Sequence, residues 1–302
     1  MNALEVEHLE VSFTIGGNRV TPVRDVSFTV PAHGRVALVG ESGCGKSLTA
    51  LSVKRLTPTD RASISGRISA PGRISYIFQN PMEALNPVMR IGSQIMEALP
   101  KEIKGREARR REVESLLERV ALPEPKRIAR AYPCELSGGQ QQRAMIAMAL
   151  AARPDLIICD EPTTALDVTT QRQVLELIDS LAAETGMAVL FITHNLGLVA
   201  KWMDSVNVLY AGEVVESGPV EEVLSEPLHP YAKGLLAAVP RLDAPMGEPL
   251  KDIPGTVPPP AEWPQGCAFH PRCANACDIC RRERPRTKEA FMGHFVACHQ
   301  HH

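Results

Sequence analysis

Residues 40–47 match the pattern G-x-x-x-x-G-K-[ST], and the chemistry of that pattern is phosphate binding. An apolar run at 35–39 precedes the loop, and the pattern after it predicts the start of a helix over 46–54. Glycines let backbone N–H groups point at phosphate oxygens, and a helix N-terminus adds partial positive charge. We expect Lys46 to reach the β- and γ-phosphates and Ser47 to offer its hydroxyl to Mg²⁺. The predicted nucleotide contacts of this segment are Gly40, Glu41, Ser42, Gly43, Cys44, Gly45, Lys46, Ser47 and Leu48.

Two adjacent acids, Asp160 and Glu161, follow the apolar run 156–159, which is typical of a buried strand. We expect Asp160 to hold Mg²⁺ through water, and Glu161 to orient and deprotonate an attacking water molecule. The alternative is an exposed strand end with no catalytic role. Four consecutive apolar residues before the acids argue against it.

The elements that position these side chains alternate between strands and helices. Strands are predicted at 4–13 and 23–30, joined through Gly16-Gly17-Asn18, and at 74–78, 156–159 and 188–192. Helices are predicted over Arg90 to about Val120, 139–152 and 168–184. Nearly continuous apolar strands between helices indicate an α/β fold with a mostly parallel sheet covered on both faces. Ligand residues then belong at the carboxyl ends of strands, where the loop 40–47, the two acids and His194 all fall.

Composition excludes several classes of protein. Of 302 residues, 44% are apolar and 23% are charged, and the net charge of −2 gives no nucleic-acid footprint. No run of 18 apolar residues occurs, and the first residues lack the basic and apolar pattern of a secretory signal. We therefore expect a cytosolic chain whose cysteines stay reduced.

A second motif, Leu136-Ser137-Gly138-Gly139-Gln140, lies about ninety residues after the phosphate loop. With it, residues 1–240 resemble the ATPase subunit of an ABC transporter. The resemblance implies a P-loop ABC ATPase with a mixed, mostly parallel sheet, an antiparallel β subdomain, a helical signature subdomain at about 85–152 and a small cysteine-rich extension at 241–302. In that family the signature residues Ser137, Gly138, Gly139 and Gln140 would cap the γ-phosphate of an ATP held by the opposite subunit.

The resemblance assigns roles to further residues. Phe13 would stack on adenine, Gln79 would contact Mg²⁺ and water and sense the membrane subunit, and Asp167 would belong to the D-loop 165–167. His194 matches the histidine that contacts the γ-phosphate. A lone histidine at a strand end is more often structural, but its place after Thr193 favours this role. The departures from the family pattern, which remove no catalytic group, are Asn195, Cys134 and Gln141-Gln142.

The family mechanism implies a nucleotide sandwich. One ATP lies between the phosphate loop of one subunit and the signature of its neighbour, so a monomer carries half a site. ATP would join two cassettes, and hydrolysis would release them.

Three stretches, 76–87, 160–169 and 229–231, resemble the oligopeptide/dipeptide importer group. Residues 145–150 and 163–164 look like the first of its two ATPase subunits. The implied partners are a second, related cassette, two permeases and an extracytoplasmic substrate-binding protein, at the cytoplasmic face of the inner membrane. Nickel chelates, opines and glutathione are alternative substrates. Two functions of other classes are alternatives. The first is a non-transport ABC ATPase: one of DNA repair needs a long coiled coil between the two nucleotide motifs, and one of translation carries two cassettes in one chain. The second is an iron–sulfur regulatory protein that only binds nucleotide, which would not need an intact Glu161 and His194.

Proline residues at 245, 249, 254 and 258–260 predict a linker beginning near residue 240. After it, Cys267-x5-Cys273-x6-Cys280-x17-Cys298, with Cys277 in addition, suggests a metal site in a reducing compartment. The importer group holds a [4Fe–4S] cluster on the matching cysteines, so the resemblance implies one here. Cysteine-only ligation fits such a cluster, and structural Zn²⁺ or unligated thiols are the alternatives. Cys44, Cys134 and Cys159 are interpreted as ordinary small residues.

Overall fold

The computed structural model describes residues 1–59, 61–164, 166–239 and 252–301. The chain forms two compact units, one built mainly from residues 70–191 and the other from 4–30, 35–69 and 192–302. The predicted boundary at 240/241 and the prolines at 245 and 249 lie outside the described residues. Among the described helices, none is both long and apolar enough to cross a bilayer.

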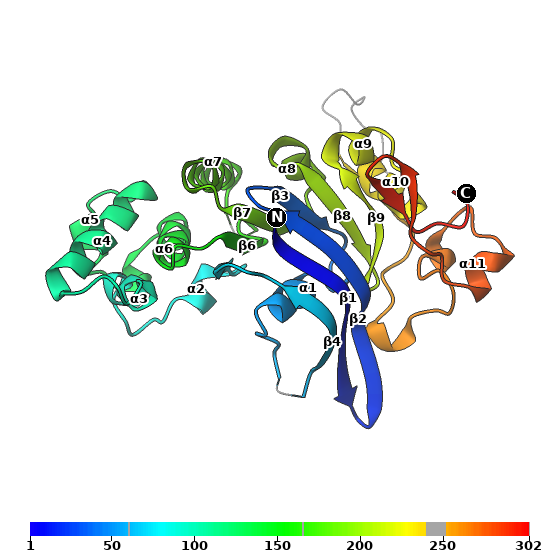
Figure 1. Ribbon diagram of the computed structural model, residues 1–302, viewed down its shortest axis with the longest axis horizontal. Coiled ribbons are helices and arrows are strands. Elements are labelled where there is room, and N and C mark those ends of the chain that lie inside the picture. The colour runs from blue at the N-terminus through cyan, green and yellow to red at the C-terminus, as the bar shows by residue number, and fades with distance from the viewer. Residues whose placement is uncertain (60, 165, 240–251, 302) are drawn as a thin grey trace. The chain divides into compact units, whose positions relative to one another are not determined.

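The larger unit is the one built from residues 4–30, 35–69 and 192–302. It contains a sheet with the strand order β4-β1-β2-β9-β8-β3 (Figure 1). β1 and β4 pair antiparallel, which agrees with the predicted antiparallel β subdomain. β3 and β8 pair parallel from Val36↔Ser205 to Val39↔Val208, whereas β8 and β9 pair antiparallel, so the sheet is mixed. Its strands are β1 (Asn2–Ile15), β2 (Asn18–Pro31), β3 (Arg35–Val39), β4 (Ser63–Ser69), β8 (Ser205–Tyr210) and β9 (Glu213–Pro219). The helices packed with it are α1 (Lys46–Val53), α8 (Leu196–Trp202), α9 (Val220–Ser225) and α10 (Pro230–Ala237).

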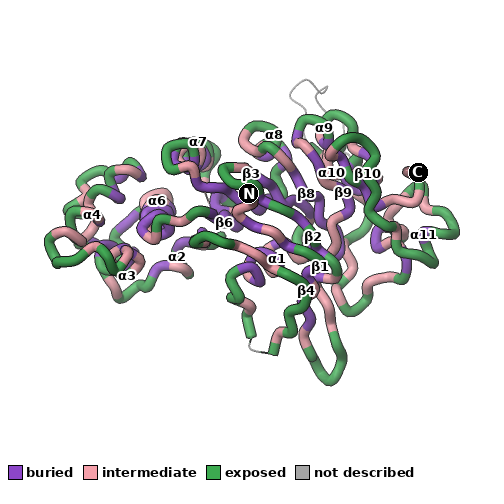
Figure 2. Tube along the Cα trace, viewed as in Figure 1, coloured by how far each residue is buried: buried purple, intermediate pink, exposed green. Residues whose placement is uncertain are grey.

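The other unit combines the strand order β7-β6-β5 with the helical segment. β5 and β6 pair parallel from Ile74↔Leu156 to Ile77↔Cys159, and every residue of β6 and β7 is buried (Figure 2). Burial on both faces explains why these strands are nearly continuous apolar runs. The elements are β5 (Ile74–Ile77), α2 (Pro81–Ala84), α3 (Ile91–Ala98), α4 (Arg106–Arg119), α5 (Pro125–Ile128), η1 (Pro133–Glu135), α6 (Gly138–Ala151), β6 (Leu156–Asp160), α7 (Val168–Thr185) and β7 (Ala188–Thr193).

The prediction of one helical segment from Arg90 to about Val120 was wrong in detail. The structure has two helices, α3 and α4, separated by residues 99–105. Pro100 follows the end of α3 and cannot continue a helix, and Gly105 precedes α4 with a φ of +87°. Proline and glycine both disfavour a continuous helix, but the charged residues around them follow a helical pattern, so the interruption was not predicted.

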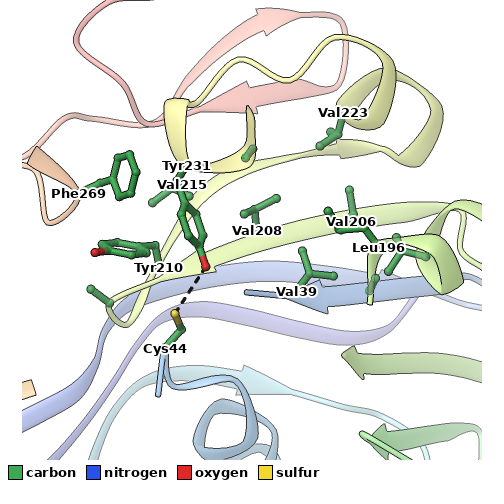
Figure 3. Packing of buried hydrophobic residues seen from close by; sticks show 14 of the residues in the cluster. Val39, Cys44, Leu196, Val206, Val208, Tyr210, Val215, Val223, Tyr231 and Phe269 are labelled. Atoms are coloured by element: carbon green, nitrogen blue, oxygen red, sulfur yellow. Dashed lines mark hydrogen bonds between the residues drawn. The ribbon is translucent and has the colours of Figure 1, made fainter. Parts of the chain in front are cut away.

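The carboxyl-terminal residues belong to the larger unit and pack within it. β11 (His294–Val296) pairs antiparallel with β9 and with β10 (Lys288–Phe291), so the extension adds a hairpin to the sheet. Phe269 lies 5.1 Å from the ring of Tyr210 and 5.4 Å from that of Tyr231, between ring centroids (Figure 3). The extension therefore shares the core of this unit. Its remaining elements are η2 (Pro260–Glu262), η3 (His270–Arg272) and α11 (Asp278–Arg282).

Candidate functional site

The loop between β3 and α1 has an unusual backbone conformation. Gly40, Gly43 and Gly45 have φ values of +154°, +84° and +96°. A Cβ at Gly40 would lie 2.2 Å from the carbonyl oxygen of Leu209, so glycine is required there by space as well as by conformation. Lys46 is only 5% exposed, and its Nζ donates hydrogen bonds to the carbonyl oxygens of Gly40 and Glu41 at 2.8 and 2.9 Å. The side chain of Lys46 thus lies along the loop whose bound phosphates it is predicted to contact.

Tyr231 on α10 is a contact of this loop that the sequence did not reveal. Its hydroxyl oxygen accepts a hydrogen bond from the N–H of Glu41 at 2.7 Å and lies 3.9 Å from the sulfur of Cys44 (Figure 3). Burial raises the pKa of the Cys44 thiol, which agrees with its interpretation as an ordinary small residue. In the sequence, residues 229–231 indicated only a resemblance to the oligopeptide/dipeptide importer group. The structure places Tyr231 beside the phosphate loop.

The two acids at the end of β6, Asp160 as its last residue and Glu161 directly after it, differ in their surroundings. Asp160 is 6% exposed and accepts a 2.7 Å hydrogen bond from the hydroxyl of Tyr76. Burial, and then the charge of Asp160, raise the pKa of Tyr76, so this hydroxyl stays protonated and remains a donor. Sequence reasoning missed Tyr76, because a tyrosine inside a short strand carries no signal of a role.

Glu161 has a φ of +44°, a conformation that is uncommon outside glycine. Its Oε2 accepts hydrogen bonds from Thr164 Oγ1 at 2.9 Å and from Gln79 Nε2 at 3.4 Å. The structure therefore brings together Gln79 and Glu161, which lie 82 residues apart in the sequence.

The signature segment begins α6. Ser137 Oγ accepts a hydrogen bond from the N–H of Gln140 at 3.4 Å, and the side chain of Gln140 accepts one from the N–H of Ser137 at 3.1 Å. This reciprocal capping box fixes the helix start. A Cβ on Gly139 would lie 3.0 Å from Thr170 Cγ2, whereas one on Gly138 would meet nothing within 4 Å.

Three further predicted contacts occupy different settings. Asp167 caps α7, with its Oδ1 accepting from the N–H groups of Thr169 and Thr170 at 3.1 and 3.0 Å, and the hydrogen bonds of Thr170 lower the pKa of Asp167. Phe13 is half-buried near the end of β1, and His194 is exposed directly after β7. Their roles toward a nucleotide, like those of the other site residues, stay predictions, and Ala165 of the D-loop lies outside the described residues.

The sequence profile of the ABC transporter family matches residues 23–164, and that of the oligopeptide/dipeptide transporter C-terminal region matches residues 215–280. The dipeptide transport ATP-binding protein DppD of Bacillus subtilis is 44% identical over 98% of this chain and 93% of its own length. A protein of Brucella abortus (strain 2308) named for peptide import is 44% identical over 93% of this chain and 90% of its own length. The chain belongs to the ABC transporter ATP-binding proteins.

Solved structures agree with this membership. The dimeric ABC transporter cassette MJ0796 superposes with a TM-score of 0.64 at 25% identity, over 72% of this chain and 98% of the cassette. An ATP-binding subunit of an ABC transporter gives 0.60 at 27% identity, over 74% of this chain and 92% of its own length. This ABC protein is an ATPase with the cassette fold that the resemblance implied.

The extension of this ABC ATPase gathers cysteines from separate segments. The N–H of Cys267 donates to the carbonyl oxygen of Cys280 at 2.8 Å, and the sulfurs of Cys277 and Cys280 lie 3.4 Å apart. Burial first, and then the charges of Cys280, Cys298 and Cys273, raise the pKa of Cys267 to about 11. Within the described ranges, no three His, Cys, Asp or Glu side chains form a group that could hold a single metal ion.

Proposed function

We propose that this chain is the ATP-hydrolysing subunit of an importer that takes up dipeptides and oligopeptides. The observation that carries this proposal is that relatives named for peptide import and dipeptide transport match the chain across the cassette and the carboxyl-terminal region together. A likeness confined to the cassette would support only ATP hydrolysis, because cassettes of this fold serve many transporters.

The site residues divide the chemistry of hydrolysis among them. The N–H groups of the phosphate loop and Lys46 bind the phosphates, and Phe13 stacks on the base. Glu161 is the general base for the attacking water, and Gln79, which already contacts it at 3.4 Å, helps to orient that water. His194 contacts the γ-phosphate. Ser47, Gln79 and Asp160 would hold Mg²⁺, which supplies charge neutralisation at the phosphates.

The signature supports a composite site. Gly138 faces open space in this chain, and the start of α6 offers N–H groups to an anion. We infer that Ser137, Gly138, Gly139 and Gln140 receive the ATP of a second, related cassette, and that Asp167 lies at the same interface. The assembly would include two permeases and an extracytoplasmic substrate-binding protein, with this chain on the cytoplasmic face of the inner membrane.

The test is ATP turnover by the importer complex reconstituted in vesicles with its binding protein. We expect turnover to rise when a mixture of dipeptides and oligopeptides is supplied, and labelled peptide to accumulate with ATP consumption. Stimulation by nickel chelates, opines or glutathione, with no response to peptides, would contradict the proposed substrate. A chain with no ATP turnover in the intact complex would contradict the proposed activity.

A second proposal concerns the cysteines. We propose that Cys267, Cys273, Cys280 and Cys298 hold a [4Fe–4S] cluster, a group that is ligated by four thiolates. Support comes from the match of residues 215–280 to the oligopeptide/dipeptide transporter C-terminal region and from a donor set made of sulfur alone.

Anaerobic purification followed by iron and sulfide analysis tests the cluster. We expect about four irons per chain and a brown colour, both lost in Cys298→Ser. Cys134→Ser, which changes an exposed cysteine outside the extension, should keep them. A colourless protein with stoichiometric zinc would contradict the proposal.

A further inference from the structure

Glu41, the second residue of the phosphate loop, is held at all three of its polar groups. Its N–H donates to the hydroxyl of Tyr231 at 2.7 Å, and its carbonyl oxygen accepts from Lys46 Nζ at 2.9 Å. Its carboxylate accepts two hydrogen bonds from Arg272, at 2.7 and 3.0 Å. Such a two-point guanidinium–carboxylate pair fixes direction as well as distance. Two of the four contacts therefore come from a residue 231 positions away.

Arg272 is itself fixed within the extension. Its side chain is 5% exposed, and it donates further hydrogen bonds to the carbonyl oxygens of Pro254 at 2.8 Å and of Ile253 and Gly255 at 3.2 Å. Its guanidinium lies 5.9 Å from the ring centroid of Phe269, which packs on Tyr231 (Figure 3). The extension thus reaches the loop directly through the Arg272 guanidinium, and its Phe269 packs on Tyr231, whose hydroxyl also contacts the loop.

We propose that Arg272 is a positioning residue for the phosphate loop, and that through it the folded extension sets the affinity of this chain for ATP. The inference rests on the proposed nucleotide site at 40–47. Three glycines with positive φ make the loop conformationally free, so its binding conformation must be held by neighbouring groups. The apparent affinity of a ligand falls in proportion to the fraction of protein in the competent conformation. By linkage, ATP bound at the loop must stabilise the extension to the same degree.

The first test is binding of a fluorescent ATP analogue to the importer complex. We expect Arg272→Gln and Glu41→Gln each to weaken binding about tenfold, the loss for a loop competent in about one molecule in ten. The double variant should bind no more weakly than the weaker single variant, because both remove the same pair. Arg284→Gln is the matched control: it removes another arginine of the extension, which pairs with Glu213, and should bind like the native chain. Losses that add in the double variant would overturn the proposal.

Arg272→Gln also leaves three carbonyl oxygens of the extension without their donor, so its effect can arise from local unfolding. Glu41→Gln changes only the loop side of the contact and keeps the proposal testable. In the native chain, ATP should slow amide hydrogen exchange over residues 263–282, and this protection should be lost in Glu41→Gln. Native-like affinity and protection in Glu41→Gln would overturn the proposal.

Lys46→Ala separates this inference from the proposed function. If Lys46→Ala still binds ATP as the native chain does, the nucleotide site itself is misassigned. If Lys46→Ala loses binding while Glu41→Gln binds normally, the nucleotide site stands and the role of Arg272 is wrong.

Discussion

The hydroxyl of Tyr76 donates a 2.7 Å hydrogen bond to the carboxylate of Asp160, which is 6% exposed at the end of β6. The tyrosine lies on β5, which pairs parallel with β6 in the register Tyr76↔Ile158. The strand pairing therefore places the donor two residues before the acid it serves. This hydrogen bond fixes the direction of the Asp160 carboxylate, which matters for a residue that is expected to bind Mg²⁺.

Tyr76→Phe should destabilise the fold, because it leaves the Asp160 carboxylate without this donor. We expect the free energy of unfolding to fall by about 1–3 kcal/mol. Chemical denaturation measures this change. Tyr132→Phe removes the hydroxyl of a 38% exposed tyrosine and should change stability little. An equal loss of unfolding free energy in the two variants would show that the Tyr76–Asp160 hydrogen bond contributes no more to stability than the hydroxyl of an exposed tyrosine.

Glu161→Gln should lower ATP turnover by about 10²–10⁴-fold, as expected when a general base is removed, while ATP binding is kept. Steady-state phosphate release and equilibrium binding give the two quantities. Glu176→Gln, at an exposed acid of α7 that pairs with Arg172, should behave like the native chain. Retained turnover in Glu161→Gln would contradict the assigned role.

The two signature glycines should respond differently to a methyl group. A Cβ at Gly139 crowds Thr170 at 3.0 Å, so Gly139→Ala should lower the stability of the isolated chain. Gly138→Ala adds a methyl group where nothing lies within 4 Å, so stability should hold while ATP-dependent association with a second cassette is lost. Thermal unfolding and sedimentation distinguish the two effects. Normal association of Gly138→Ala would argue against a nucleotide approaching that face.

The contribution of the segment around α10 to the stability of the fold should fall in acid. Burial, and then the charges of His301 and Lys233, lower the pKa of His229 to about 3 from an ordinary 6.5. Between pH 6.5 and 3 the unfolded chain therefore binds a proton at His229 that the folded chain does not bind. The contribution of this group to the free energy of unfolding is complete above pH 6.5 and is lost as the pH falls toward 3. At pH 5.5 the loss from this group is about 1.4 kcal/mol.

Urea unfolding at pH 7.5 and 5.5 measures this loss. His229 Nδ1 caps α10 by accepting from the N–H of Tyr231 at 3.0 Å, and an asparagine can also accept that bond without titrating. His229→Asn should therefore remove about 1.4 kcal/mol of the pH dependence. An unchanged pH dependence in this variant would contradict the assignment to His229.

The strand ends could be predicted because buried parallel strands are uninterrupted apolar runs. The run 156–159 located Asp160 and Glu161, and the run 188–192 located His194, and the structure has both strands. The signature helix was predicted over 139–152 and lies at Gly138–Ala151, so each end was predicted to within one residue. The capping box of Ser137 and Gln140, which fixes its start, was found in the structure.

The contacts between distant segments could not be predicted. Arg272 and Glu41 are 231 residues apart, and an ion pair leaves no periodic pattern in the sequence. Asn195 was a departure from the family pattern with no evident role, and the structure shows it capping α8 through the N–H of Gly197 at 3.0 Å. Such roles depend on which side chains the fold brings together.

We infer that Ser137 of this chain completes an ATP site whose phosphate loop belongs to the second cassette. Photolabelling of the importer complex with 8-azido-ATP tests this inference, in the Glu161→Gln background that traps ATP. We expect Ser137→Arg in this chain to remove the label from the partner cassette, while label on this chain persists. Undiminished labelling of the partner cassette would show that Ser137 does not complete that site.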